Sequence, residues 1–399
     1  MALLSQAMGR IAPSPTVAMS SRARELQQAG RDVIALAAGE PDFDTPAHVR
    51  EAAKRAIDEG RTRYTAVDGI PELKAAIAAK FARENGLEYR PEEISVGTGG
   101  KQVLFNALLA TLDPGDEVVV PAPYWVSYPD IVRLTGAKPA VVPTTAEGGY
   151  LLGPEALEAA ITPRTKWLIL NSPSNPTGAV YDAAALRALA DVLERHPQVW
   201  VLTDDIYEHL VYEGRFTTIA AAAPALKDRT LTLNGASKAY AMTGWRIGYG
   251  AGPKPLIDAM RMLQSQSTTN PCSISQWAAV AALTGPQDYL GEALTAFRRR
   301  RDLVLEGLAE APGLDCPKPA GAFYVYPGIA PLIGRTSAGG RRIADDTAFA
   351  EALLDEAGVA VVQGAAFGAS PAFRVSYATD DASLRDACGR IAEFCAGLR

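Results

Sequence analysis

The sequence predicts an α/β protein with a mostly parallel central sheet flanked by helices, joined to a smaller α+β domain formed by both termini. In the middle of the chain, short continuous apolar runs alternate with helical patterns, which is typical of parallel strands buried on both faces. From about Gly285 onward, a long helical pattern leads into a second unit. The 399 residues are enough for one large and one small domain.

Five apolar runs are the predicted strands of the large domain, and a helical pattern at 182–195 is the predicted crossover between two of them. The runs lie at residues 117–121, 140–143, 167–171, 199–204 and 230–234. A further helix is predicted at 102–112. Ligands of such sheets bind beyond the carboxyl ends of the strands, so the polar residues that follow these runs are candidate site residues.

The second unit is predicted to hold strands within 321–326 and 373–377, a final helix at 383–398 and the N-terminal segment. We therefore expect an N-terminal segment at 1–45 that belongs to the small domain, a large domain at 46–295 and the rest of the small domain at 296–399. The Gly/Ala/Arg stretch at 334–342 is interpreted as a surface insertion.

Composition narrows the function classes. The net charge of −6 argues against nucleic acid as a main partner, and the arginine run at 298–301 is expected on a solvated helix face. No apolar run approaches the roughly 20 residues of a membrane helix, and the N-terminus lacks a signal-peptide pattern, so a cytoplasmic location is expected. The four cysteines and three histidines have no metal-site spacing, so no metal is expected.

Lys238 is the strongest candidate for a catalytic residue. It lies among small residues at the end of an apolar run, and Arg246 follows eight positions later. A partly desolvated lysine amine loses its proton readily and can form a Schiff base, while a neighbouring arginine suits a phosphate. Because most lysines are solvated surface charges, the interpretation depends on other residues.

Two loops after predicted strands support a ligand site. Residues 97–101 place glycines before a helix, where free backbone N–H groups can hold a phosphate. This motif is neither a Walker loop nor a complete dinucleotide fingerprint, so a helix start without a ligand is the alternative. Residues 171–178 contain two prolines and a glycine, which force an irregular backbone and allow a cis bond between Asn175 and Pro176.

Asp204 and Arg374 are charges predicted in apolar surroundings. A buried carboxylate at a strand end is costly without a positive partner, and a protonated pyridine nitrogen would be such a partner. A helix cap formed by Asp204 or Asp205 is the alternative. Arg374 lies inside an apolar strand, where its planar fork suits a carboxylate, and a structural ion pair is the alternative.

Together, these residues resemble the class I aminotransferases, which are fold-type I pyridoxal-phosphate enzymes. The motifs that carry the resemblance are 39–43, Tyr64, 123–125, 175–178, Asp204 with Tyr207, Ser237 with Lys238, 244–246 and Arg374. They keep the family order from about Pro13 to the C-terminus. The sequence is most similar to the bacterial aspartate aminotransferase subgroup in which some members also accept prephenate.

The resemblance implies that pyridoxal 5'-phosphate is the cofactor and that the enzyme is a homodimer with shared active sites. Lys238 would bind the cofactor covalently and then move the proton, and Asp204 would pair with the pyridine nitrogen. The cofactor-binding residues implied are Gly99, Gly100, Lys101, Trp125, Asn175, Asp204, Tyr207, Ser237, Lys238 and Arg246, with Tyr64 from the other subunit. The substrate-binding residues implied are Gly39, Lys101, Trp125, Asn175 and Arg374.

Three positions depart from the family pattern. Gly235 stands where many relatives have a phosphate-binding serine, and Ser237 is expected to take part of that role. Residues 264–270 contain no arginine to bind the distal carboxylate of the substrate across the dimer, so Lys101 is expected to bind it. Ala12 stands where relatives that accept prephenate commonly carry a lysine.

The implied function is aspartate:2-oxoglutarate aminotransfer with ping-pong kinetics. The closest alternative is an aspartate/prephenate or aromatic aminotransferase, and another pyridoxal-phosphate reaction such as β-elimination is a further one. A regulator with an aminotransferase-like domain would carry a DNA-binding domain before the first motif, whereas here the motifs begin within the first 20 residues. A nucleotide-binding enzyme that uses the glycine loop would leave Lys238, Asp204 and Arg374 unexplained.

Overall fold

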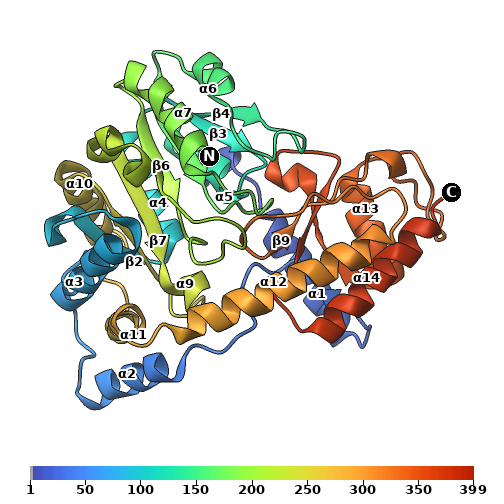
Figure 1. The fold of residues 1–399 in the computed structure, drawn as a ribbon, viewed down its shortest axis with the longest axis horizontal. Helices are drawn as coiled ribbons and strands as arrows, with labels where there is room; N and C mark the ends of the chain where they lie inside the picture. Colours follow the sequence, from blue (N-terminus) through green and yellow to red (C-terminus); the bar gives the residue numbers. More distant parts are fainter. Residues whose placement is uncertain (1–2) are drawn as a thin grey trace.

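The computed structural model describes residues 3–399, and its centre is a seven-stranded sheet (Figure 1). The strand order is β2-β8-β7-β6-β5-β3-β4, and only β8 runs antiparallel to its neighbours. The strands are β2 (Ile94–Thr98), β3 (Glu117–Ala122), β4 (Lys138–Pro143), β5 (Thr165–Asn171), β6 (Trp200–Asp204), β7 (Thr230–Gly235) and β8 (Ile247–Ala251). The predicted mostly parallel sheet is therefore confirmed.

Helices cover both faces of this sheet (Figure 1). Along β3, Val118 and Val120 pack with one set of helices while Val119 packs with the other, so all three valines are buried. This two-sided burial is why the strand is continuously apolar. The helices of this part are α2 (Ala47–Asp58), α3 (Pro71–Lys80), η2 (Phe81–Asn85), η3 (Pro91–Glu93), α4 (Gly100–Thr111), α5 (Ser127–Thr135), α6 (Pro154–Ala160), α7 (Ala183–Arg195), α8 (Ile219–Ala222), η4 (Pro224–Arg229), α9 (Ala236–Ala239), α10 (Lys254–Ser265) and α11 (Ser273–Thr284).

A smaller α+β unit is built from both ends of the chain. Near the N-terminus, β1 (Ile34–Ala35) pairs in parallel with β10 (Val359–Ala360), while β11 (Val362–Gln363), β12 (Phe373–Ser376) and β9 (Tyr324–Val325) form an antiparallel sheet. Its helices are η1 (Gln6–Arg10), α1 (Pro15–Gln28), α12 (Asp288–Ala309), η5 (Ala330–Leu332), α13 (Asp346–Ala352), η6 (Leu353–Ala357), η7 (Gly364–Phe367) and α14 (Asp381–Ala396). The long α12 crosses the predicted boundary at 295/296, and the boundaries themselves stay a prediction.

The expectation that the arginine run at 298–301 is solvated is wrong for half of the run. Arg299 is exposed, but Arg300 and Arg301 are buried on α12. The Arg300 guanidinium donates to both carboxylate oxygens of Asp42, at 2.6 and 2.8 Å. A bidentate carboxylate offsets the cost of burying this charge, and it fixes the loop around Asp42 to α12.

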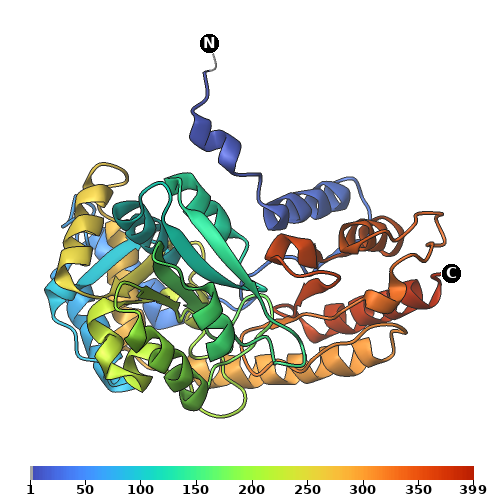
Figure 2. The same cartoon turned by 90° about the horizontal axis from the view of Figure 1, so that it is seen from above.

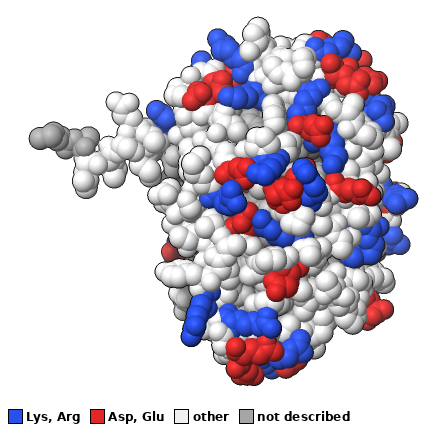
Figure 3. Space-filling model, turned by 90° about the vertical axis from the view of Figure 1, so that its left-hand side faces the viewer, with Lys and Arg blue, Asp and Glu red and all other residues white. Residues whose placement is uncertain are grey.

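The N-terminal segment leaves the body of the molecule, as Figure 2 shows. It exposes large apolar side chains, with Leu3 98% and Leu4 70% accessible. On the face drawn in Figure 3, acidic and basic side chains are interspersed. Within residues 3–399, no helix is both long enough and apolar enough to span a membrane.

Candidate active site

A cavity of about 540 Å³ opens at the carboxyl edge of the central sheet, between the sheet and the small unit. The ends of β5, β6 and β7 contribute Asn171, Asp204 and the turn into α9, where Lys238 lies. The predicted residues that line the cavity are Gly39, Gly100, Lys101, Trp125, Asn175, Asp204, Tyr207, Ser237, Lys238, Arg246 and Arg374. Residues up to 335 positions apart in the sequence therefore meet in one place.

Lys238 lines the cavity, and its ammonium group donates a hydrogen bond to the Gly39 carbonyl. Burial lowers the pKa of Lys238 to about 8, with Arg374 and Arg246 adding repulsion and Glu40 opposing the shift. A lysine with this pKa supplies a neutral, nucleophilic amine near physiological pH far more readily than an exposed one.

Asp204 is buried at the end of β6 and accepts a hydrogen bond from the Tyr128 hydroxyl at 2.7 Å. Burial raises the pKa of Asp204 to about 6, and the Tyr128 hydrogen bond opposes that shift. The side chain is therefore mostly ionised at pH 7. Neither Asp204 nor Asp205 caps a helix, because a turn without a helix follows β6, so the capping alternative is wrong.

Arg374 extends from β12 into the cavity and has no ion-pair partner among residues 3–399. Its two terminal nitrogens donate to Asn175 Oδ1 at 2.9 Å and to the Ala37 carbonyl at 2.6 Å, while Nε lacks a partner. The structural ion pair that was the alternative is absent from this part of the chain. A buried guanidinium held only by neutral oxygens is a receptor for an anion.

The glycine loop and Arg246 lie together at one end of the cavity. The guanidinium of Arg246 packs against Gly99, and a side chain at position 99 would collide with it. Gly99 has a φ of 83° and precedes α4, whose free N–H groups face the same region. The Lys101 ammonium lies 4.7 Å from the Trp125 ring centre.

At Gly235, a Cβ atom would lie 3.0 Å from Ile206 Cδ1 and 3.1 Å from the Ile247 carbonyl oxygen. There is no free space for the serine that many relatives of the predicted family carry. Ser237 is buried and lines the cavity two residues further on. Its hydroxyl can therefore replace the missing one.

The sequence interpretation missed two tyrosines. Tyr128 binds Asp204, and Tyr324 shares a 2.8 Å hydrogen bond with Tyr207 while its ring lies 4.6 Å from the Arg374 guanidinium. Tyr128 comes three residues after the motif at 123–125, and Tyr324 lies in the predicted strand within 321–326. The sequence therefore contained the signal for their positions but not for the direction of their side chains. Tyr64 does not line the cavity, and 91% of it is exposed.

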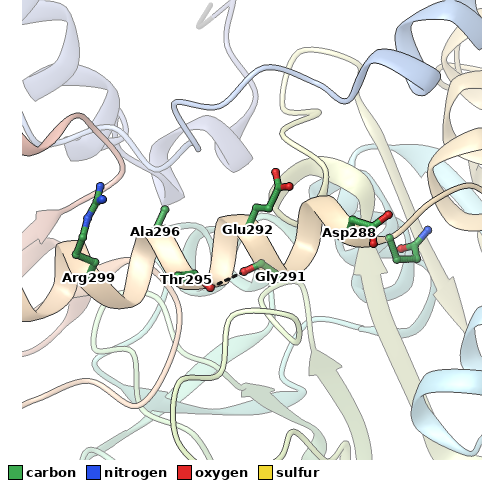
Figure 4. A pocket seen from close by; sticks show the side chains of 7 residues that line it. Asp288, Gly291, Glu292, Thr295, Ala296 and Arg299 are labelled. Carbon is green, nitrogen blue, oxygen red and sulfur yellow. Dashed lines mark hydrogen bonds between the residues drawn. The ribbon is translucent and has the colours of Figure 1, made fainter.

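A second hollow runs along the first half of α12 and is the one drawn in Figure 4. All its lining residues come from α12 and the residue before it, and the only hydrogen bond drawn joins Thr295 to the Gly291 carbonyl within the helix. It has no opposing wall, so it does not resemble a ligand site.

A family model for aminotransferase class I and II matches residues 31–391, and the chain belongs to this family. The protein is thus an aminotransferase. Among the similar proteins, an aspartate/prephenate aminotransferase of Cereibacter sphaeroides is 66% identical over the full length of both chains. The aspartate aminotransferase structure from Rhizobium meliloti covers both chains completely, with 56% identity and a TM-score of 0.97. That of Thermus thermophilus aspartate aminotransferase with maleate covers 99% of this chain and 100% of that one, with 50% identity and a TM-score of 0.92.

Proposed function

We propose that this aminotransferase holds pyridoxal 5'-phosphate at Lys238 and transfers an amino group between aspartate and 2-oxoglutarate. The observation that carries the proposal is the convergence of Lys238, Asp204, Tyr207 and Arg374 on one cavity. An amine, a buried carboxylate, a phenol and an unpaired guanidinium match the separate parts of the cofactor and of an amino-acid substrate.

The residues present fit the cofactor. The α4 N-terminus, Ser237 and Arg246 would hold the phosphate, and the buried Asp204 carboxylate lines the same cavity and would pair with a pyridinium nitrogen. Tyr207 and Asn175 supply hydrogen bonds to the ring oxygen. When bound, pyridoxal 5'-phosphate supplies an electron sink for the pair of electrons that the Cα proton leaves behind.

The protein residues then have distinct tasks. Asp204 would hold a positive charge on the ring nitrogen of a bound cofactor, and the Lys238 amine would be the base for the proton on the substrate Cα. A positioned base of this kind typically contributes roughly 10²- to 10⁴-fold. Arg374 with Asn175 binds the α-carboxylate, which fixes the substrate with its Cα near the lysine amine. Gly39 and Trp125 complete the substrate wall.

A second cation favours dicarboxylic substrates. Lys101 lines the same cavity as Arg374 and is available for the distal carboxylate. The maleate in the related Thermus thermophilus structure is a dicarboxylate, which supports this proposal. β-Elimination and decarboxylation do not require such a pair of anchors.

The cofactor and the substrate can be tested together by recording the absorbance spectrum of the purified protein during titration with L-aspartate. We expect a yellow protein whose visible band is replaced by a shorter-wavelength band as the amino group is transferred, and restored by 2-oxoglutarate. A colourless protein that also fails to bind added pyridoxal 5'-phosphate would contradict the proposal.

Aspartate/prephenate aminotransfer is a second candidate, favoured by the name of the Cereibacter sphaeroides relative. Ala12 lines a hollow that shares Lys101 and Arg246 with the active site. Arg10, the nearest basic residue before it in the sequence, donates instead to the Leu134 carbonyl at 3.4 Å. Position 12 is thus near the site but offers no charge to a second carboxylate.

We therefore expect prephenate to be a poor acceptor and Ala12→Lys to improve it. One charge-assisted hydrogen bond to a carboxylate contributes about 1.5–3 kcal/mol, roughly 10- to 150-fold in kcat/KM. Aspartate turnover should stay nearly unchanged, and Ala12→Met serves as a control of similar length without charge. Equal kcat/KM for prephenate and oxaloacetate in the unmodified protein would overturn this expectation.

We further propose a homodimer in which Tyr64 reaches the phosphate site of the partner. The projecting N-terminal segment, the exposed Tyr64 and the 67% exposed Met262 support a large apolar contact surface. The net charge of −6 also supports a proposal without nucleic acid as a partner, and a cytoplasmic location is proposed with it.

Subunit mixing tests the shared site. Lys238→Ala and Tyr64→Ala subunits should each be nearly inactive, yet their hybrid should regain activity because one of its two sites contains both native residues. In a random mixture half of the dimers are hybrids, and each hybrid has one working site. We therefore expect about one quarter of the wild-type activity. Hybrids that form, as shown by differential tags, but stay inactive would rule out the contribution of Tyr64 across the interface.

A further inference from the structure

Behind the active site, a buried cluster of charged and amide side chains lies against the segments that carry Tyr207 and Lys238. Its members are Lys80, Glu84, Asn85, Glu208, His209 and Asn234. None of them lines the cavity. Lys80, Glu208 and Asn234 are buried, while Glu84, Asn85 and His209 at the outer side of the cluster are half-buried.

The Glu208 carboxylate is the centre of this cluster. One oxygen accepts hydrogen bonds from the Lys80 ammonium and from Asn234 Nδ2, the latter at 2.7 Å, and the other accepts from Asn85 Nδ2 at 2.7 Å. Burial alone would raise the pKa of Glu208, but the Lys80 charge and these donors outweigh it and hold the pKa below its usual value. The cluster is therefore an ionised, hydrogen-bonded network.

This network does not have the properties of a metal site. Glu84, Glu208 and His209 have ligand atoms close together. However, the Lys80 ammonium contacts Glu208 and lies 3.5 Å from a Glu84 oxygen, so the positive charge that the carboxylates require is already present. A divalent cation would have to displace a buried lysine.

Asn234 joins the cluster to the catalytic lysine. It lies on β7 four residues before Lys238, and its amide oxygen accepts from the Gly235 N–H at 2.7 Å while its amide nitrogen donates to Glu208. Glu208 in turn directly follows Tyr207, whose phenol faces the cavity. One side-chain hydrogen bond thus connects the segment with the lysine to the segment with the phenol.

We propose that the Asn234–Glu208 pair is a positioning device that fixes the Lys238 amine relative to the Tyr207 phenol. The inference rests on the proposed function, because both groups act on the same cofactor ring. Displacements near 1 Å at a reacting centre lower rates strongly, so a rigid link between the two segments has a direct effect on catalysis. Neither Asn234 nor Glu208 lines the cavity that would hold the substrate and the cofactor.

Asn234→Ala cuts this link but leaves the Lys80–Glu208 ion pair intact. We expect the pH midpoint of the visible absorbance change of the bound cofactor to move by about half a pH unit or more. We also expect kcat to fall about 10-fold with KM changed less than about threefold. Asn85→Ala is the matched control, because it removes another amide donor to Glu208 without touching β7. It should lower thermal stability similarly while leaving the midpoint and kcat unchanged.

Two results would overturn the inference: an unchanged midpoint and kcat in Asn234→Ala, or equal changes in both variants. Should Asn234→Ala not fold, Asn234→Ser carries the same test, since the shorter side chain cannot reach Glu208. A wild-type protein without a visible cofactor band contradicts the proposed function itself. If the wild-type protein has the visible band and neither Asn234 variant changes its pH midpoint, only the positioning role is contradicted.

Discussion

Lys238→Ala is expected to abolish aspartate aminotransfer. The variant loses both the covalent attachment of the cofactor and the base that removes the Cα proton, and the base alone is worth roughly 10²- to 10⁴-fold. The visible band should also disappear, because the other lysine that lines the cavity, Lys101, has its ammonium over the Trp125 ring. Initial rates with aspartate and 2-oxoglutarate, together with the spectrum, measure both effects.

Lys254→Ala is the control for the loss of a lysine as such. Lys254 opens α10 and is half exposed in an ion pair with Asp258, away from the cavity. Surface pairs of this kind contribute little, so wild-type turnover is expected. Retained activity above one per cent in Lys238→Ala, with wild-type cofactor content, would contradict the assignment.

Asp204→Ala has the second largest expected effect. Without the carboxylate, the ring nitrogen loses its charged partner and the cofactor becomes a poor electron sink. Removing one preorganised electrostatic group from a water-excluded site typically costs about 10²–10³ in kcat. Single-turnover rates of Cα-proton removal from aspartate should fall by this factor, while the dissociation constant of aspartate changes little because Arg374 is intact.

Asp205→Asn is a matched control, since Asp205 is the adjacent buried carboxylate but lies outside the cavity. Burial raises the pKa of Asp205 to about 7, and its carboxylate accepts a hydrogen bond from the Thr203 hydroxyl. Near wild-type single-turnover rates are expected. Asp204→Ala rates within a few-fold of wild type would show that the carboxylate is not the partner of the ring.

The sequence predicts β3, β5, β6 and β7, because each of these strands is a continuous apolar run. It does not predict β2 and β8, which contain glycine. A side chain at Gly248 would collide with the backbone at Gly99 and Gly100, and one at Gly250 would approach Val103. Glycine is required there by the close approach of α4, a fact that depends on contacts distant in the sequence.

Ion pairs between residues that are distant in the sequence could not be predicted either. Arg300 looks solvated in a basic run, since the Asp42 that pairs with it is 258 residues away. Lys80 and Glu208 meet across 128 residues, and neither belongs to a recognisable motif. By contrast, Asp204, Lys238 and Arg374 could be found because each is a charge inside an apolar run or at its end, where burial itself signals a special role.

Borohydride reduction followed by peptide mapping tests most directly whether Lys238 carries the cofactor. Reduction makes the bond between the lysine and pyridoxal 5'-phosphate permanent, so the modified residue can be identified by mass. We expect one phosphopyridoxyl group per chain, on the peptide containing Lys238. Modification of any other lysine in its place, including Lys101 in the same cavity, would contradict it.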